Sequence, residues 1–182
     1  MNKEERYQTY RALMPIHTRL DSEVLEDLGF FTAPASTKYH GAYEGGLFDH
    51  SLAVTESLVE LTEKLGLEWS RPESPYIVGM YHDFCKCDNY VKINSIEEVA
   101  PITQKYKYDS TIIIPGHGDK SVIMIQKYIK LTDEEIACIR WHMGAYETDT
   151  KMWDYYGRAI ERYPNVLYTH IADMIASKIK GV

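Results

Sequence analysis

The stretch GGLFDHSLAVTESLVELTEKLG, residues 45–66, carries the strongest helical signal in the chain. Its apolar residues recur at spacings of 7, 4, 3 and 4, which places them on one face of an α-helix: Leu47, Val54, Leu58, Leu61 and Leu65. Gly66 is a natural stop for this helix. His50 lies on the same face, four residues before Val54, so its side chain is expected to point toward the core.

Further helical signals lie on both sides of this segment. Ser74 and Pro75 are expected to be the N-cap and the first residue of a helix that reaches Tyr81. The capping box at 132–135 opens another helix, with Gly144 as its expected C-terminal cap. Helices are also predicted over residues 3–28, as two short helices interrupted near Pro15, over 118–130 and over 166–179.

The segment from 88 to 115 has a different pattern. The runs YVKI at 90–93 and TIIIP at 111–115 have β-like composition, and KYKY at 105–108 is expected to be the first arm of a hairpin. The sequence therefore predicts an all-α protein, a helical bundle, with a small β excursion around residues 88–115.

Composition restricts the class of protein. The 182 residues are 45% hydrophobic and 26% charged, with a formal net charge of −7, which suits one globular domain spanning 1–182. The N-terminus lacks the apolar core of a signal peptide, and no apolar run approaches the roughly 18 residues that span a bilayer. A cytoplasmic protein without a membrane partner is expected, and the acidic charge disfavours one that coats nucleic acid.

The three cysteines, Cys85, Cys87 and Cys138, have neither the spacing of a zinc ribbon nor the number typical of a disulfide scaffold. We expect all three to be reduced and to have no metal role.

Two aspartates lie close to histidines in apolar stretches of the sequence, where a buried charge needs a partner. His82 and Asp83 follow an apolar helical turn, and Asp173 lies in an apolar run three residues after His170. A buried carboxylate must be paired or bind a cation. Taken singly, each residue has a structural alternative: a salt bridge for Asp173, and one satisfying hydrogen bond in the core for His50.

Six residues from separate segments together favour a metal site: His50, His82, Asp83, His117, His142 and Asp173. Imidazole and carboxylate groups are preferred ligands of divalent ions such as Zn, Mn, Fe, Co and Ni.

Five motifs occur in this order: GGLFDHS at 45–51, YHDFCK at 81–86, GHGDKS at 116–121, RWHMG at 140–144 and HIADMIASK at 170–178. Together they resemble the HD-domain superfamily of metal-dependent phosphohydrolases. The closest resemblance is to the HD domain of bacterial 3′→5′ exoribonucleases and includes the run from His40 to His50. It covers about residues 38–178 and implies an HD-domain helical bundle.

The resemblance implies that one divalent ion (Mn, Fe, Co, Ni, Zn or Mg) is held by His50, His82, Asp83 and Asp173. His117 and His142 match positions that help hold a second ion in binuclear members. Met143 stands where those relatives often have a histidine, and a thioether is a poor ligand for such an ion. The sequence therefore leaves open whether a second ion binds. His117 and His142 are alternatively expected to contact phosphate or donate a proton.

The activity implied is hydrolysis of a phosphomonoester or phosphodiester of a nucleotide or short oligonucleotide through a metal-activated water. The exoribonucleases also carry a separate nucleic-acid-binding domain, and nothing before residue 38 is long or β-rich enough to form one, so long nucleic acid is disfavoured as a substrate. Two alternatives are a nucleotide-binding sensor module with slow or no turnover, and a purely structural role for the six residues. The sequence leaves open whether the chain forms a homo-oligomer.

Specific roles follow from the resemblance. Asp83 is the candidate to orient or deprotonate the water, and His117 or His142 to protonate the leaving oxygen. Lys86, retained although Cys85 replaces the family's usual glycine, is expected to neutralise charge on the phosphoryl oxygens. The remaining expectations are that His40 and Tyr43 border the pocket, that His170 supports Asp173 without binding the ion, and that Arg140 and His17 are surface residues.

Overall fold

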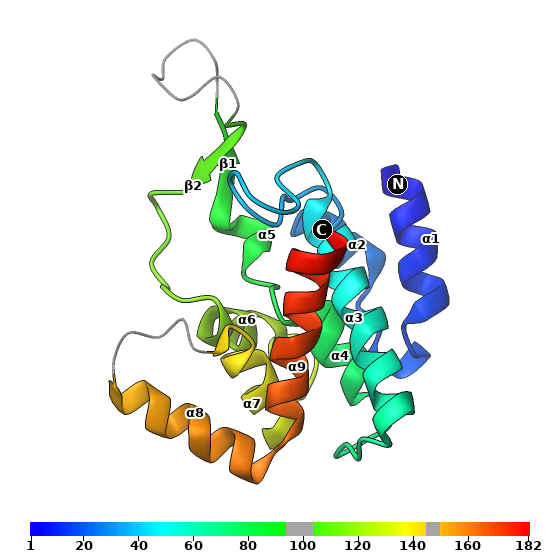
Figure 1. Cartoon of the computed structure of the whole chain (residues 1–182). Coiled ribbons are helices and arrows are strands. Elements are labelled where there is room, and N and C mark those ends of the chain that lie inside the picture. Colours follow the sequence, from blue (N-terminus) through cyan, green and yellow to red (C-terminus); the bar gives the residue numbers. More distant parts are fainter. Residues whose placement is uncertain (94–103, 145–149) are drawn as a thin grey trace.

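The computed structural model describes residues 1–93, 104–144 and 150–182, which are mostly helical (Figure 1). The first half contains α1 (Lys3–Leu13), η1 (Ile16–Thr18), α2 (Ser22–Asp27), α3 (Gly46–Leu65), α4 (Ser74–Tyr81), α5 (Lys86–Asn89) and β1 (Tyr90–Lys92). The second half contains β2 (Tyr106–Tyr108), α6 (Gly118–Ile125), α7 (Asp133–Trp141), α8 (Thr150–Arg162), α9 (Asn165–Met174) and η3 (Ile175–Lys180). The predicted all-α class with a small β element is confirmed.

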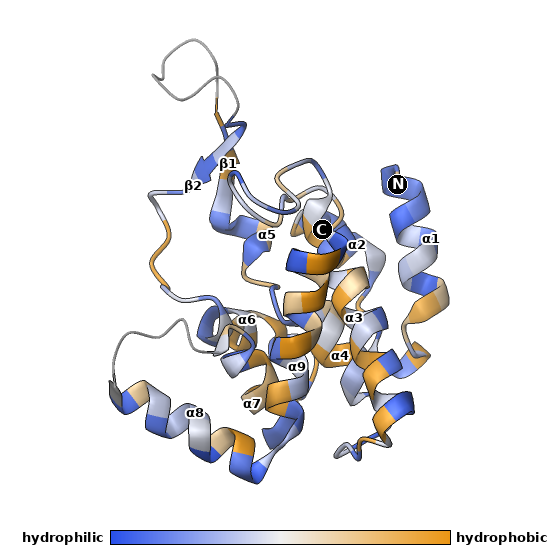
Figure 2. Cartoon of the chain, in the orientation of Figure 1, coloured by the Kyte–Doolittle hydropathy of each residue, from blue (hydrophilic) through white to orange (hydrophobic). Residues whose placement is uncertain are grey.

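The helix predicted from the opening stretch lies at the centre of the bundle. α3 packs against α4 and α9, and α7 packs against α6 and α9. Leu47, Val54, Leu58 and His50 are fully buried, which confirms the predicted core-facing side of α3. Figure 2 shows apolar residues concentrated on the central α4, whereas the peripheral α8 is mostly polar. The core is therefore formed where α3, α4, α7 and α9 meet.

A glycine allows α3 and α4 to approach closely. A Cβ atom at Gly79 would lie 2.5 Å from the Cα of Thr55 on α3, so a side chain does not fit between these helices. This close approach places the residues that follow α4 directly beside α3.

The observed helix ends agree in part with those predicted from the sequence. Gly66, with φ 64°, ends α3, and the capping box of Thr132 and Glu135 opens α7 as predicted. The start of α4 was predicted one residue late: Glu73 is the N-cap, and the Ser74 hydroxyl instead donates to Glu135 Oε1 at 2.8 Å. Gly144 is not the cap of α7, because that helix already ends at Trp141.

The two short N-terminal helices are confirmed on either side of Pro15, and the last helix covers the predicted range as α9 followed by the π-helix η3. α6 ends at Ile125, five residues earlier than predicted. No helix was predicted over residues 150–162, where the structure has α8.

The predicted hairpin is wrong in its strand pairing. β2 pairs antiparallel with β1, with Tyr90 opposite Tyr108, so the run at 105–108 supplies the second arm. Residues 111–115 are not a strand. The Asp109 carboxylate accepts hydrogen bonds from the backbone and hydroxyl of Thr111, which turns the chain directly after β2. Ile113 is 91% exposed, so this apolar run has no partner face to bury against.

Among the described residues, no helix is both long and apolar enough to cross a lipid bilayer.

Candidate metal centre

The core helices bring the predicted ligands to one place. His50 comes from α3, His82 and Asp83 directly follow α4, and His142 directly follows α7. Asp173 lies in the last turn of α9, where its Oδ1 is 3.2 Å from His50 Nε2. The helix packing therefore converts residues that are far apart in the sequence into one cluster.

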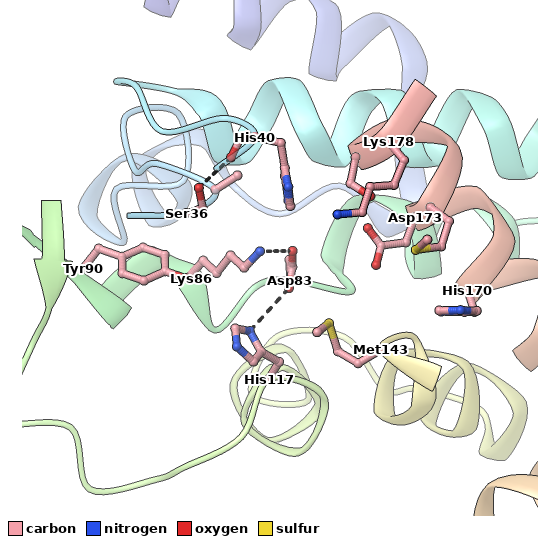
Figure 3. A pocket seen from close by; sticks show the side chains of 13 residues that line it. Ser36, His40, Asp83, Lys86, Tyr90, His117, Met143, His170, Asp173 and Lys178 are labelled. Carbon is pink, nitrogen blue, oxygen red and sulfur yellow. Dashed lines mark hydrogen bonds and ion pairs between the residues drawn. The ribbon is translucent and has the colours of Figure 1, made fainter. Parts of the chain in front are cut away.

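Asp83 lies at the centre of this cluster, and its two oxygens have different neighbours. Oδ2 is 3.5 Å from His50 Nε2 and 3.4 Å from His82 Nε2. Oδ1 is 3.4 Å from His142 Nε2 and 3.9 Å from His117 Nδ1, as the side chains in Figure 3 show for His117. One carboxylate thus faces two sets of nitrogen atoms.

Backbone carbonyls fix the tautomers of three histidines. The Nδ1 atoms of His50, His82 and His142 lie 2.9, 2.8 and 2.7 Å from the carbonyl oxygens of Val182, Gly79 and Ile139, respectively. A carbonyl only accepts, so each neutral ring carries its hydrogen on Nδ1 and presents the Nε2 lone pair to the cluster. The Nε2 atoms of His50 and His82 are 3.2 Å apart. Two lone pairs facing each other at this distance repel, and a shared cation removes the repulsion.

Two buried atoms of the cluster lack hydrogen bonds. Asp83 Oδ1 and His142 Nε2 have no hydrogen-bond partner among the described residues, although both side chains are within the core. Leaving such acceptors unpaired costs about 1–3 kcal/mol each. Ligand atoms of His50, His82 and Asp173, and those of His82, Asp83 and His142, lie within 4.8 Å of one another. The donor set and its unpaired atoms fit a divalent ion.

Charge keeps both carboxylates ionised. Burial alone would raise the pKa of Asp83, but Lys86, with its Nζ 2.6 Å from Asp83 Oδ2, and His82 hold it well below its ordinary value. Burial likewise opposes ionisation of Asp173, and the contact with His50, together with the nearby His82 and His142, keeps its pKa low. Both carboxylates are therefore available as anionic ligands at neutral pH.

A pocket opens onto this cluster (Figure 3). Its lining includes Asp83, Lys86, His117 and Asp173. Burial lowers the pKa of His117, which keeps its imidazole neutral, and its side chain remains 29% exposed. Burial, together with the charges of His50 and Lys86, lowers the pKa of His40 to about 4. The pocket thus combines one buried cation and two ionised carboxylates with neutral imidazoles.

Some neighbouring residues differ from their predicted positions. His40 lines the pocket as predicted, but Tyr43 does not: its hydroxyl donates to Asp49 at 3.1 Å. His170 also lines the pocket, and its Nδ1 bonds to the carbonyl of His142 at 2.8 Å instead of to Asp173. Outside the pocket, Arg140 forms an ion pair with Asp119, and His17 is exposed as predicted.

The three cysteines are free, which agrees with their predicted reduced state. The sequence did not indicate that Cys85 lies beside the cluster, with its Sγ 3.9 Å from His117 Nδ1. Burial, aided by the Asp83 charge, raises the pKa of Cys85 to about 12, so this sulfur is a neutral thiol at physiological pH.

Several further pocket residues were missed: Ala35, Ser36, Tyr90, Met174, Ser177 and Lys178. Met174 and Ser177 follow His170 by four and seven residues, so helical periodicity offered a signal for them. Ala35 and Ser36 lie in a loop, where periodicity gives no such signal.

Comparison with known proteins identifies the family of the chain and two relatives. The sequence model of the HD domain matches residues 47–177, so the chain belongs to the HD-domain family. A dihydroneopterin 2′,3′-cyclic phosphate phosphodiesterase of Methanocaldococcus jannaschii is 36% identical over 111 residues, covering 49% of this chain and 43% of that protein. A symmetrical bis(5′-nucleosyl)-tetraphosphatase of Staphylococcus aureus is 28% identical over 106 residues, covering 57% of this chain and 52% of that protein.

The chain thus spans about half the length of the curated relatives it matches. No solved structure matches it significantly.

Proposed function

We propose that this protein is a metal-dependent phosphohydrolase that cleaves a phosphomonoester or phosphodiester of a nucleotide or short oligonucleotide. One observation carries the proposal: inward-facing imidazole lone pairs converge with two ionised carboxylates at the base of a pocket, and two of the buried acceptors lack partners. This arrangement is suited to a divalent cation and an anionic substrate.

The ion would be held by His50, His82, Asp83 and Asp173. The Nε2 atoms of His50 and His82 lie close to Asp83 Oδ2, and Asp173 Oδ1 lies close to His50 Nε2. The Oδ1 side of Asp83, with His142 and His117, supports a second position for an ion. A bound divalent ion supplies a Lewis acid for the phosphoryl group and lowers the pKa of water toward 7.

The chain's own residues would perform the remaining tasks. Asp83 would orient the attacking water, and its ionised carboxylate at the pocket supports this role. Lys86 holds that carboxylate ionised and contributes positive charge to the pocket wall. His117 is neutral and partly exposed, so its imidazole can donate a hydrogen bond to a phosphoryl or leaving oxygen.

One relative acts on a cyclic phosphate and the other on a dinucleoside tetraphosphate, which supports a small nucleotide-like substrate for this chain. The more specific likeness to exoribonuclease HD domains stays a prediction. Short oligonucleotides therefore belong in the substrate panel alongside mononucleotides.

The first test measures metal content and hydrolysis. The purified protein is loaded separately with Mn²⁺, Co²⁺, Ni²⁺ or Mg²⁺ and incubated with nucleoside monophosphates, cyclic phosphates, dinucleoside polyphosphates and short oligonucleotides. We expect product formation that depends on the ion, and a loss of at least about 100-fold when His82→Ala and Asp83→Ala are combined.

Lys64→Ala is the matched control, because Lys64 is exposed and its ion pair among the described residues is with the exposed Glu60. Full activity in the folded double variant, or in protein stripped of metal by EDTA, would overturn the proposal. Nucleotide binding without any product would instead identify a sensor module.

A further inference from the structure

The π-helix η3 follows Asp173 almost directly and changes which residues share its face. In a regular α-helix, residues five apart point about 140° away from each other. A π-helix has i→i+5 hydrogen bonds, which bring residues five apart toward one face. Asp173 and Lys178 are five apart, and both line the pocket together with Met174 and Ser177 (Figure 3). Most of the chain between Asp173 and Lys178 is π-helical, and both residues line the same pocket beside the metal cluster.

The ammonium group of Lys178 has no partner among residues 1–93, 104–144 and 150–182. Within the part of the chain that the structure describes, it has no hydrogen bond and no ion pair. The other pocket lysine, Lys86, is already held by Asp83 at 2.6 Å. Lys180, two residues further on, turns to α3, where its Nζ is 3.8 Å from Glu56 Oε2. Lys178 is thus a positive charge at the pocket that forms no ion pair with a carboxylate of the described residues.

Uncharged polar groups lie on the same pocket wall. The ring of His40 and the hydroxyl of Ser177 line the pocket, and neither has a hydrogen-bond partner among the described residues. An imidazole carries at least one N–H in either protonation state, so the His40 ring offers a donor to the pocket. Ser36 is not available in this way, because its hydroxyl donates to the carbonyl of His40 at 2.8 Å. One free cation and two free donors suit an anion.

We infer that Lys178, with His40 and Ser177, forms a subsite for a second phosphate of the substrate. The inference rests on the proposed function and narrows its substrate class. In this arrangement the metal cluster and Lys86 bind the phosphate that lies at Asp83. A nucleoside monophosphate has no further phosphate to bind Lys178. A nucleotide with an additional phosphate, joined through an anhydride or through the sugar, places a second anion on this lysine.

The test is calorimetric titration of the Mn²⁺-loaded full chain with three probes: AMP, α,β-methylene-ADP and adenosine 3′,5′-bisphosphate. The second and third probes separate an anhydride-linked from a sugar-linked phosphate, and chromatography checks that each remains intact. We expect the wild-type protein to bind at least one bisphosphate about tenfold more tightly than AMP. Lys178→Ala removes this preference and leaves AMP binding within about twofold, whereas Lys178→Arg retains it.

Lys180→Ala is the matched control, because this neighbouring lysine faces α3, and it keeps the wild-type preference. Equal affinity of the wild type for all three probes, or an unchanged preference in Lys178→Ala, overturns the inference. Because binding is read without turnover, a protein that hydrolyses nothing yet shows the Lys178-dependent preference refutes only the proposed function.

Discussion

Asp83 depends on a single protein cation when no metal ion is bound. The residue is 2% exposed, Oδ2 accepts from Lys86, and Oδ1 has no hydrogen-bond partner among the described residues. Removing one member of a buried ion pair leaves the other charge without compensation. A divalent ion at the cluster would supply that compensation, so the importance of Lys86 to stability should depend on the metal.

Lys86→Met is expected to destabilise the metal-free protein by about 3 kcal/mol, since it leaves Asp83 as a buried, unpaired anion. In the Mn²⁺-loaded protein the loss should be clearly smaller, because the ion replaces the lost positive charge. Urea unfolding followed by circular dichroism, with EDTA and with Mn²⁺, measures both values. Lys64→Met should change neither curve measurably, since its ion pair is exposed. An equal loss in both metal states would contradict a cation at Asp83.

Individual site residues differ in how far the sequence indicates them. His50 is recognisable because it occupies the apolar face of a long helix, and Asp173 because a carboxylate in an apolar run needs a partner. Cys85 and Lys178 are not, because their positions depend on how α6 packs beside the cluster and on a π-helix that periodicity does not reveal.

At the scale of elements, the contact between α3 and α4 sets the distance between His50 and His82. Gly79 permits that contact, and its carbonyl also accepts the Nδ1 hydrogen of His82. One residue thus controls both the helix spacing and the orientation of a candidate ligand.

Gly79→Ala is expected to destabilise the fold by roughly 1–3 kcal/mol, because its Cβ would lie 2.5 Å from Thr55 Cα and would push α3 away from α4. The same displacement separates His50 from His82 and should weaken Mn²⁺ binding. Denaturant unfolding and metal titration measure the two effects.

Gly157→Ala is the matched control, because a Cβ there meets nothing within 4 Å and α8 gains about 0.5–1 kcal/mol from alanine. A Gly79→Ala protein with wild-type stability and wild-type metal affinity would show that the close approach is not required.

Elements were predictable where local patterning and tertiary packing agree. The apolar face of α3 and the capping box of α7 specify those helices locally, and both formed as predicted. The run at 111–115 has residues with high β-strand propensity. After the Asp109 turn it has no strand to pair with among the described residues, so it does not form a strand. Strand formation depends on a partner segment, which local composition does not identify.

At the scale of the whole molecule, the candidate metal centre connects the core helices. Its ligands come from α3, from the segments that directly follow α4 and α7, and from α9. A ligand that binds only the folded state stabilises it in proportion to the logarithm of its concentration. A bound ion should therefore act as a cross-link for the entire bundle.

EDTA treatment is expected to lower the melting temperature, and Mn²⁺ to restore it, with a stabilisation of about 4 kcal/mol when the free ion is 1,000-fold above its Kd. Scanning calorimetry across a Mn²⁺ series measures the shift. Asp173→Ala should reduce the shift strongly, since it removes the carboxylate nearest His50. A melting temperature independent of Mn²⁺ in the wild-type protein would argue against a structural metal.

The helical class, the central helix and the identities of the candidate ligands can be predicted from periodicity and residue chemistry, which act over a few positions. The tertiary packing is needed to show that Asp83 lies between two sets of nitrogen atoms, that three imidazoles present their Nε2 atoms inward, and that Lys178 lines the pocket. Each of these depends on backbone carbonyls, helix spacing or helix type contributed by distant segments, and no local pattern encodes such contacts.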